Sequence, residues 1–349
     1  MSVETFLQAR MVRLCRKAVS DMTLDLSGLR VLTEAATGPF AATATIAALA
    51  GAEVVAVSRD SRWGSAQQAF AATRELAERL GCDRSIIFSD KPPAELAAGC
   101  DLVTNLGFVR PIDGELIARL SSFAAVSLMW EPWEFRDTDI DRAALDAAGI
   151  PLIATNEAHP RVRTFAYLGP TIGRLLLDEG FEIVGSRLLI VGSDPFGAAV
   201  ANWLADAGAC VIRAELADWA AHVAFDADID ALVVVEHRDH RDLLTVADTF
   251  KALRQLAAMG APIVRLCGTI DRTVVAANGG RLVPATDVPA GVMSVTTAYA
   301  GPRPVIDLHT AGLKAGGIVV AARRSGASID EAISAAVASG FGLAMGVST

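Results

Sequence analysis

The sequence predicts an α/β fold made of two Rossmann-like domains, each built on a doubly wound parallel sheet. Hydrophobic residues make up 52% of the chain and aromatic residues only 6%, a balance typical of buried parallel strands under alanine-rich helices. A chain of 349 residues is also long for one hydrophobic core. Finally, residues 26–32 and 183–189 are similar, and each leads through a small-residue turn and an alanine-rich helix to a strand after Gly-Ala.

The first half alternates between apolar runs and amphipathic segments. After strands at 26–32 and 51–56, we expect a helix at 66–80, strands at 85–88 and 102–105, a helix at 113–120, a strand at 124–129, a helix at 142–148 and a strand at 151–154. This series is long enough to complete one doubly wound sheet.

The second half repeats the alternation. We expect a helix at 164–178 that crosses between domains, a strand at 188–191, a helix at 198–204, strands at 210–213 and 231–235, a helix at 243–259, strands at 263–266 and 294–298, and helices at 311–323 and 329–338. The predicted domains are 1–155 plus 311–349, of the substrate-binding or catalytic type, and 156–310, of the dinucleotide-binding type.

Composition excludes several classes of function. The formal net charge is −9 with no basic run, which argues against a nucleic-acid partner. The apolar window at 40–57 is short for a membrane span and contains a charge, and residues 1–16 lack the apolar core of a signal peptide. The five cysteines are scattered without CxxC spacing, which indicates reduced thiols. We therefore expect a cytoplasmic protein with no membrane contact and no metal site.

A dinucleotide-binding turn is the most informative motif. It consists of Gly192, Ser193, Asp194, Pro195, Phe196 and Gly197. A strand precedes this turn, a helix follows it, and the next strand leads to Glu215, where such folds place an acid that binds ribose. Asp194 occupies the position at which a middle glycine normally lets the backbone approach the pyrophosphate. Its bulk and charge therefore make this motif weaker evidence for a nicotinamide cofactor. Arg213, just before Glu215, is suited to a 2′-phosphate, which leaves NADP open beside NAD.

Residues 110–211 resemble the formate and D-2-hydroxyacid dehydrogenase family. The resemblance rests on Asp139-Ile-Asp141, a short helix, the Gly149-Ile-Pro-Leu152 strand and a long helix that enters the glycine-rich turn. His309-Thr-Ala-Gly312 is similar to the segment that carries the family's acid/base histidine. The Gly-Ala strand starts also resemble adenosylhomocysteine hydrolase, a relative with a similar architecture.

The resemblance implies roles for two further residues. His309 would exchange the proton that accompanies hydride transfer, and Arg265 would hold the substrate carboxylate through a forked hydrogen bond. The family's glutamate partner of the histidine is missing, because no glutamate occurs between Arg265 and His309. Asp271, Asp287 and Asp307 are the candidates to replace it.

Ligands in open parallel sheets bind beyond the carboxyl ends of the strands. The residues that follow the predicted strands are Glu34, Gly38, Asn105, Arg110, Trp130, Glu131, Trp133, Asn156, Asp194, Glu215, Glu236, His237 and Arg265. Among them, Glu236 is expected at the cofactor and Glu131 and His237 at the substrate. The tryptophans beside Glu131 are suited either to stacking on a ring or to domain packing. His237 and His240 form a histidine pair that is more typical of a surface loop than of a metal site.

The leading hypothesis is an NAD(P)-dependent oxidoreductase that acts on a small, polar, anionic metabolite in an interdomain cleft, as a homodimer. Glu34-Ala-Ala-Thr-Gly38 resembles in spacing the acid-to-glycine turn of adenosylmethionine methyltransferases. It keeps a non-redox enzyme, such as an adenosylmethionine-dependent transferase, as the alternative. A binding protein without cofactor or catalysis is the third possibility, because fold alone does not decide function.

Overall fold

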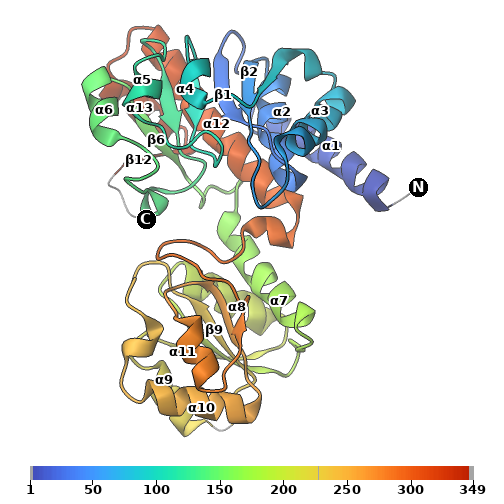
Figure 1. Ribbon diagram of the computed structural model, residues 1–349, viewed down its shortest axis with the longest axis vertical. Coiled ribbons are helices and arrows are strands. Elements are labelled where there is room, and N and C mark those ends of the chain that lie inside the picture. The colour runs from blue at the N-terminus through green and yellow to red at the C-terminus, as the bar shows by residue number, and fades with distance from the viewer. Residues whose placement is uncertain (1–2, 227, 346–349) are drawn as a thin grey trace. The chain divides into compact units, whose positions relative to one another are not determined.

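A computed structural model describes residues 3–226 and 228–345. The chain divides into two compact units, residues 1–163 with 301–349 (unit 1) and residues 164–300 (unit 2). The divisions therefore fall at 163/164 and 300/301, where the sequence placed them at 155/156 and 310/311. The predicted α/β class with two Rossmann-like, mostly parallel sheets is confirmed (Figure 1).

Unit 1 is built on a seven-stranded sheet in the order β12-β6-β5-β4-β1-β2-β3. Its strands are β1 (Arg30–Glu34), β2 (Glu53–Val57), β3 (Ile86–Ser89), β4 (Leu102–Thr104), β5 (Ala125–Ser127), β6 (Leu152–Thr155) and β12 (Gly342–Ala344). All pair in parallel except β12, which runs antiparallel to β6. Because successive side chains face opposite sides, Val31 enters one core and Leu32 the other, and both are fully buried.

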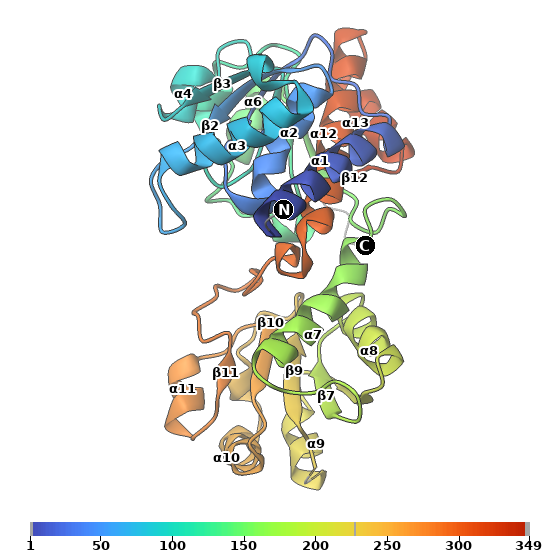
Figure 2. The same cartoon turned by 90° about the vertical axis from the view of Figure 1, so that its right-hand side faces the viewer.

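Helices cover both faces of this sheet (Figure 2). They are α1 (Val3–Asp21), α2 (Ala42–Leu49), α3 (Ala66–Leu80), α4 (Pro93–Leu96), α5 (Gly114–Ile117), α6 (Arg142–Ala148), α12 (Pro302–Arg324) and α13 (Ile329–Ala338), with 3-10 turns at Gly38–Ala41, Asp83–Ser85 and Pro132–Glu134. The beginning and the end of the chain pack together, since α12 contacts α1, α2 and α13. Local signals set these bounds: Ser65 and Gln68 form a capping box that starts α3, and Gly81 ends it with a φ of 77°.

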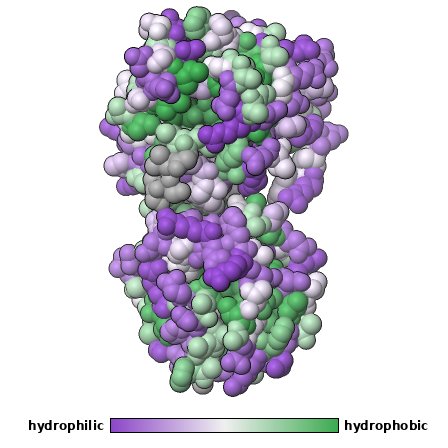
Figure 3. Space-filling view, turned by 90° about the vertical axis from the view of Figure 1, so that its left-hand side faces the viewer, coloured by the Kyte–Doolittle hydropathy of each residue, from purple (hydrophilic) through white to green (hydrophobic). Residues whose placement is uncertain are grey.

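Of the helices within the described residues, α12 alone has the length and hydropathy of a membrane span. However, 78% of its apolar stretch is buried inside the protein. Leu313, Val319 and Val320 lie in the core of unit 1, which accounts for its apolar character. On the face shown in Figure 3, apolar side chains lie in small groups among hydrophilic ones.

Unit 2 is built on a five-stranded parallel sheet in the order β11-β10-β9-β7-β8. Its strands are β7 (Arg187–Val191), β8 (Cys210–Ala214), β9 (Ala231–Val235), β10 (Ile263–Cys267) and β11 (Leu282–Val283). Its helices are α7 (Leu168–Asp178), α8 (Phe196–Asp206), α9 (Trp219–Phe225), α10 (Thr249–Met259) and α11 (Arg272–Ala277), with 3-10 turns at Thr164–Tyr167, Leu243–Thr245 and Thr297–Ala300. The strand order reverses between β7 and β9, as it does between β1 and β4 in unit 1.

Three predicted elements differ most from the observed ones. Residues 294–298 form no strand: β11 pairs with β10 instead, and Ser294 donates a single backbone hydrogen bond to Leu266. The predicted helix at 243–259 is interrupted at Asp248, whose φ is 59°. Helix α12 begins nine residues before the predicted start at 311, because a proline is accommodated in the first turn of a helix.

Candidate functional site

The glycine-rich turn joins β7 to α8, and close packing requires its two glycines. A Cβ on Gly192 would lie 2.6 Å from the carbonyl oxygen of Val235, and one on Gly197 would lie 2.1 Å from that of Gly192. Both separations are too short for any side chain. The glycines therefore let β7, β9 and α8 approach one another, as the dinucleotide-binding frame requires.

Asp194 occupies the start of α8 with its own carboxylate. Its Oδ1 accepts a hydrogen bond from the backbone N–H of Ala198 at 3.0 Å. Arg213, on the neighbouring strand, donates to the same oxygen at 2.8 Å and to the carbonyl of Gly192 at 3.2 Å. An internal anion with its own counter-charge thus stands at the helix terminus where a Rossmann fold receives a phosphate. Pro195 removes one further backbone donor from this turn.

The carboxyl ends of β7 and β9 are tied together by Glu236. Its carboxylate accepts hydrogen bonds from the Ser193 N–H at 2.9 Å and hydroxyl at 2.6 Å, and from the N–H groups of Arg238 and Asp239. Burial works to raise the pKa of Glu236, but these hydrogen bonds outweigh it and hold the pKa below its usual value. Glu236 is therefore an anion engaged by the protein itself.

Phe196 and His237 pack together beside the carboxyl ends of β7 and β9. Their rings stack with centroids 4.1 Å apart and an interplanar angle of 15°. Burial lowers the pKa of His237 to about 4, so the imidazole is neutral at pH 7. The predicted residues in the turn after β7 thus contact the two predicted residues that follow β9, Glu236 and His237.

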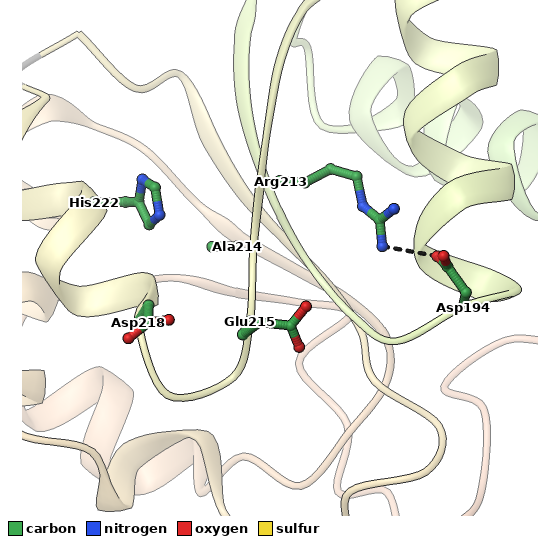
Figure 4. Close-up of a pocket in the computed structure, with 6 residues that line it drawn as sticks. All are labelled: Asp194, Arg213, Ala214, Glu215, Asp218 and His222. Carbon is green, nitrogen blue, oxygen red and sulfur yellow. Dashed lines mark hydrogen bonds and ion pairs between the residues drawn. The ribbon is translucent and has the colours of Figure 1, made fainter.

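A cavity of about 380 Å³ lies beside the end of β8. It is lined by Asp194, Arg213, Ala214, Glu215, Asp218 and His222 (Figure 4). Arg213 extends from β8 toward Asp194, and the Glu215 carboxylate points to the same side of the strand. This volume lies at the lower end of the range of small-molecule sites, although its lining is mostly charged where such sites are mostly apolar. Sequence reasoning found Glu215 but missed Asp218 and His222, which lie one turn apart at the start of α9.

Arg265 makes two side-chain hydrogen bonds within its own unit, while its buried Nε has no partner among the described residues. It is 1% exposed on β10, and its two terminal nitrogens donate to the carbonyls of Ile270 and Thr286. Burial lowers the pKa of its guanidinium from the usual value. The Arg265 guanidinium, which the sequence analysis assigned to the substrate carboxylate, thus binds the two loops that follow β10 and β11.

His309 lies within α12, in the core of unit 1. Its Nδ1 is 2.6 Å from the Thr43 hydroxyl, its ring contacts Phe40, and the residue is 3% exposed. Burial lowers the pKa of His309 to about 3, so the ring is neutral at pH 7. Of the three proposed carboxylate partners, Asp271 caps α11 and Asp287 pairs with Arg272, while Asp307 is on α12 itself with its pKa raised to about 6 by burial.

The strand ends of unit 1 carry a second group of polar residues. Glu34 ends β1 and accepts a hydrogen bond from the Phe108 N–H at 3.3 Å, and burial raises its pKa to about 7. Glu131 is 2% exposed, after β5. Burial also raises the pKa of nearby Glu134; Arg136 opposes this effect and the charge of Glu131 adds to it. Within the described part of the chain, no three His, Cys, Asp or Glu side chains are grouped as metal ligands.

No protein-family model and no curated protein sequence matches the chain. Among solved structures, one component of the dipicolinate synthase of Bacillus halodurans is similar at 12% identity with a TM-score of 0.52, covering 82% of this chain and 96% of that one. A dipicolinate synthase component from Bacillus subtilis gives 12% identity and a TM-score of 0.55, covering 87% and 100%.

An NAD-dependent formate dehydrogenase from Staphylococcus aureus, in complex with NAD, is also among the similar structures, at 13% identity with a TM-score of 0.40, covering 82% and 93%. At these identities, the similarity concerns the fold. The two-unit fold implied by the resemblance to formate and D-2-hydroxyacid dehydrogenases is confirmed.

Proposed function

We propose that the chain is an NAD(H)-dependent oxidoreductase that acts on a small anionic metabolite. The observation that carries this proposal is the cavity at the end of β8, with Glu215 on its wall. In a dinucleotide-binding unit, an acid at this position accepts hydrogen bonds from the adenosine ribose. The resemblance of residues 110–211 to the formate and D-2-hydroxyacid dehydrogenases supports the same class of reaction.

The residues of unit 2 fit the adenosine half of the cofactor better than its pyrophosphate. Glu215 and the cavity suit a ribose, whereas Asp194 holds the helix terminus with a negative charge. The proposed cofactor is NAD and not NADP, because Arg213 is already paired with Asp194. When bound, the nicotinamide supplies or takes the hydride. The chain's own groups must hold the adenosine and keep the Asp194 charge paired with Arg213.

The proton is assigned to His309 in this proposal. The Thr43 hydroxyl at Nδ1 orients the neutral ring, and because burial disfavours the charged form, His309 would hold the proton only transiently. Glu131 and His237 remain the further candidates for contact with the substrate. The cytoplasmic location and the homodimer belong to the same proposal; all five cysteines are free thiols, which agrees with a reducing compartment. Light scattering of the purified chain tests the dimer.

The non-redox alternative is favoured by one observation. The Asp194 carboxylate, held by Ala198 and Arg213, stands where a pyrophosphate would bind. An adenosine ligand without phosphates, such as adenosylmethionine, would reach Glu215 without meeting this charge. The two functions differ in which ligand the unit 2 cavity accepts.

Titration with NADH, NADPH and adenosylmethionine, followed by tryptophan fluorescence, separates them. We expect NADH to bind and Glu215→Gln to weaken it about tenfold or more, as hydrogen bonds to a charged group do. Asp206→Asn is the matched control, because Asp206 is an exposed acid at the far end of α8. Binding of adenosylmethionine alone would favour the transferase, and failure of all three ligands to bind would favour a function without them.

A further inference from the structure

Four polar atoms near the strand ends of unit 1 are buried without a hydrogen-bond partner among the described residues. They are Ser58 Oγ, Asn105 Nδ2, Arg110 Nε and Trp130 Nε1. Each belongs to a segment that follows a strand: β2 for Ser58, β4 for Asn105 and Arg110, and β5 for Trp130. Buried donors are normally hydrogen-bonded, so a group of them at one sheet edge calls for an acceptor.

A hydrogen bond and a cation–ring contact link three of these residues, Asn105, Arg110 and Trp130. The Asn105 side-chain oxygen accepts from the N–H of Met129 at 2.8 Å, directly before Trp130 in the chain. The Arg110 guanidinium lies 5.3 Å from the centre of the Trp130 ring. Since Asn105 is fully buried, the partner of its amide must be a group enclosed at this site, either a ligand or a water. Its orientation is also settled, because the oxygen is used by Met129.

The existing partners of Arg110 leave one side of its guanidinium available. One terminal nitrogen pairs with Asp139, and the other lies beside Gly107, near Glu34. The Nε has no partner among the described residues, yet the side chain as a whole keeps 24% of its surface exposed. The side chain is therefore partly open to solvent, while its unpartnered Nε is buried.

The unused donors favour an anion, and the local charge limits how much negative charge that anion can carry. The unused groups include three N–H donors and a hydroxyl, and Arg136 adds a second guanidinium 5.9 Å from the Trp130 ring centre. Glu34, Glu131, Glu134 and Asp139 lie at the same edge, so a dianion such as phosphate would meet more repulsion than a monoanion. A carboxylate offers about four lone-pair sites in one plane to such donors.

We propose that Asn105, Arg110 and Trp130 form a carboxylate-binding site in unit 1, and that this site, in place of Arg265, holds the anionic group of the substrate. As an anion site it depends only on the geometry of unit 1. Its assignment to the substrate rests on the proposed oxidoreductase function. Arg265 is left as the residue that fixes the loops of unit 2.

The indole N–H of Trp130 gives a direct readout in the intact chain. The protein has five tryptophans, so ¹⁵N-tryptophan labelling gives a small set of indole signals. Trp130→Phe identifies the Trp130 signal by its loss. Trp63→Phe identifies that of Trp63, a 74%-exposed tryptophan of the same unit that serves as the control. Acetate, oxalate and inorganic phosphate are then titrated without any nucleotide.

We expect acetate to move the Trp130 signal saturably and to leave the Trp63 signal in place, and oxalate, a dianion at neutral pH, to bind more weakly. Calorimetry should show that Trp130→Phe weakens binding about tenfold or more, while Trp63→Phe does not. Asn105→Asp keeps the oxygen that accepts from Met129 but replaces the amide donor by a negative oxygen, so it should abolish binding. Asn202→Asp, at an exposed position, is its control.

Several results would overturn the proposal. They are an unmoved Trp130 signal, equal affinity in Trp130→Phe and wild type, and tighter binding of phosphate than of acetate. If Asn105→Asp fails to fold, the Trp130→Phe result still decides. Carboxylate binding without NADH binding would keep the anion site and reject the oxidoreductase function, whereas NADH binding without carboxylate binding would do the reverse.

Discussion

The two units differ in whether the polar groups at the carboxyl ends of their strands have hydrogen-bond partners. In unit 2, Glu236 accepts four hydrogen bonds, Phe196 stacks on His237, and the Asp194 carboxylate accepts from the N–H of Ala198, so these groups at the strand ends are partnered within the unit. In unit 1, the corresponding edge leaves Asn105 and neighbouring donors without partners among the described residues. The glycine-rich turn of unit 2 is therefore evidence for the fold, whereas the unpartnered donors of unit 1 are evidence for a ligand site.

The largest expected effect concerns the chemistry assigned to unit 1. His309→Gln should lower turnover by about 10²- to 10⁴-fold with little change in substrate affinity, since general acid/base groups act mainly in the transition state. His240→Gln, at an exposed histidine, is the control. Steady-state kinetics with an identified substrate checks this. Normal turnover by a folded His309→Gln protein would transfer the role to Glu131 or His237.

Glu34 makes the stability of the protein depend on pH. Its pKa is about 7 in the folded state and 4.5 in the unfolded chain, because burial disfavours the charged form. The folded state therefore binds more protons between these values, and stability falls as the pH rises from about 4.5 to above 7. Relative to wild type, Glu34→Gln should gain about 3 kcal/mol across this window.

Urea unfolding at pH 5 and pH 8 measures the difference. Glu95→Gln, on an exposed turn of the same unit, should show no such change. A Glu34→Gln protein whose stability follows that of wild type at both pH values would show that Glu34 is not held protonated by burial.

In unit 2, Asp194→Gly should tighten NADH binding by about 5- to 150-fold, because it removes a negative charge beside the pyrophosphate and frees Arg213. Asp194→Asn separates charge from bulk, since it keeps an oxygen for the N–H of Ala198. Calorimetry checks both. If neither variant nor wild type binds any nicotinamide nucleotide, unit 2 is not a dinucleotide site.

The smallest effect is expected at Arg265. Lysine cannot reproduce both hydrogen bonds to Ile270 and Thr286, so Arg265→Lys should lower stability by about 1–2 kcal/mol. Urea unfolding measures this loss. A rise in KM at unchanged stability would instead support the substrate role that the sequence suggested.

The fold was largely predictable because its signals are local. Apolar runs followed by Gly-Ala strands define β1, β2, β7 and β8, and each is buried or paired as expected. The predicted strand at 294–298 was wrong because β-branched residues alone do not show that β11 already occupies the edge of β10. Strand β12 was missed because Gly342–Ala344 is too short to carry a periodic pattern.

The candidate site was only partly predictable. Gly192, Gly197 and Glu215 follow from spacing, but the Arg213–Asp194 pair depends on the register in which Arg213 lies beside Ile190. Sequence position placed Asn105 and Arg110 at strand ends. That their donors are unused emerges only from the packing of β4 and β5 with their loops.

A crossed titration of NADH and acetate on the full chain tests the central claim, that the two units bind different ligands at their strand ends. We predict that Glu215→Gln weakens NADH binding and leaves acetate unchanged, and that Trp130→Phe weakens acetate binding and leaves NADH unchanged. Affinities for both ligands that fall together in each variant, or that change in neither, would contradict the account.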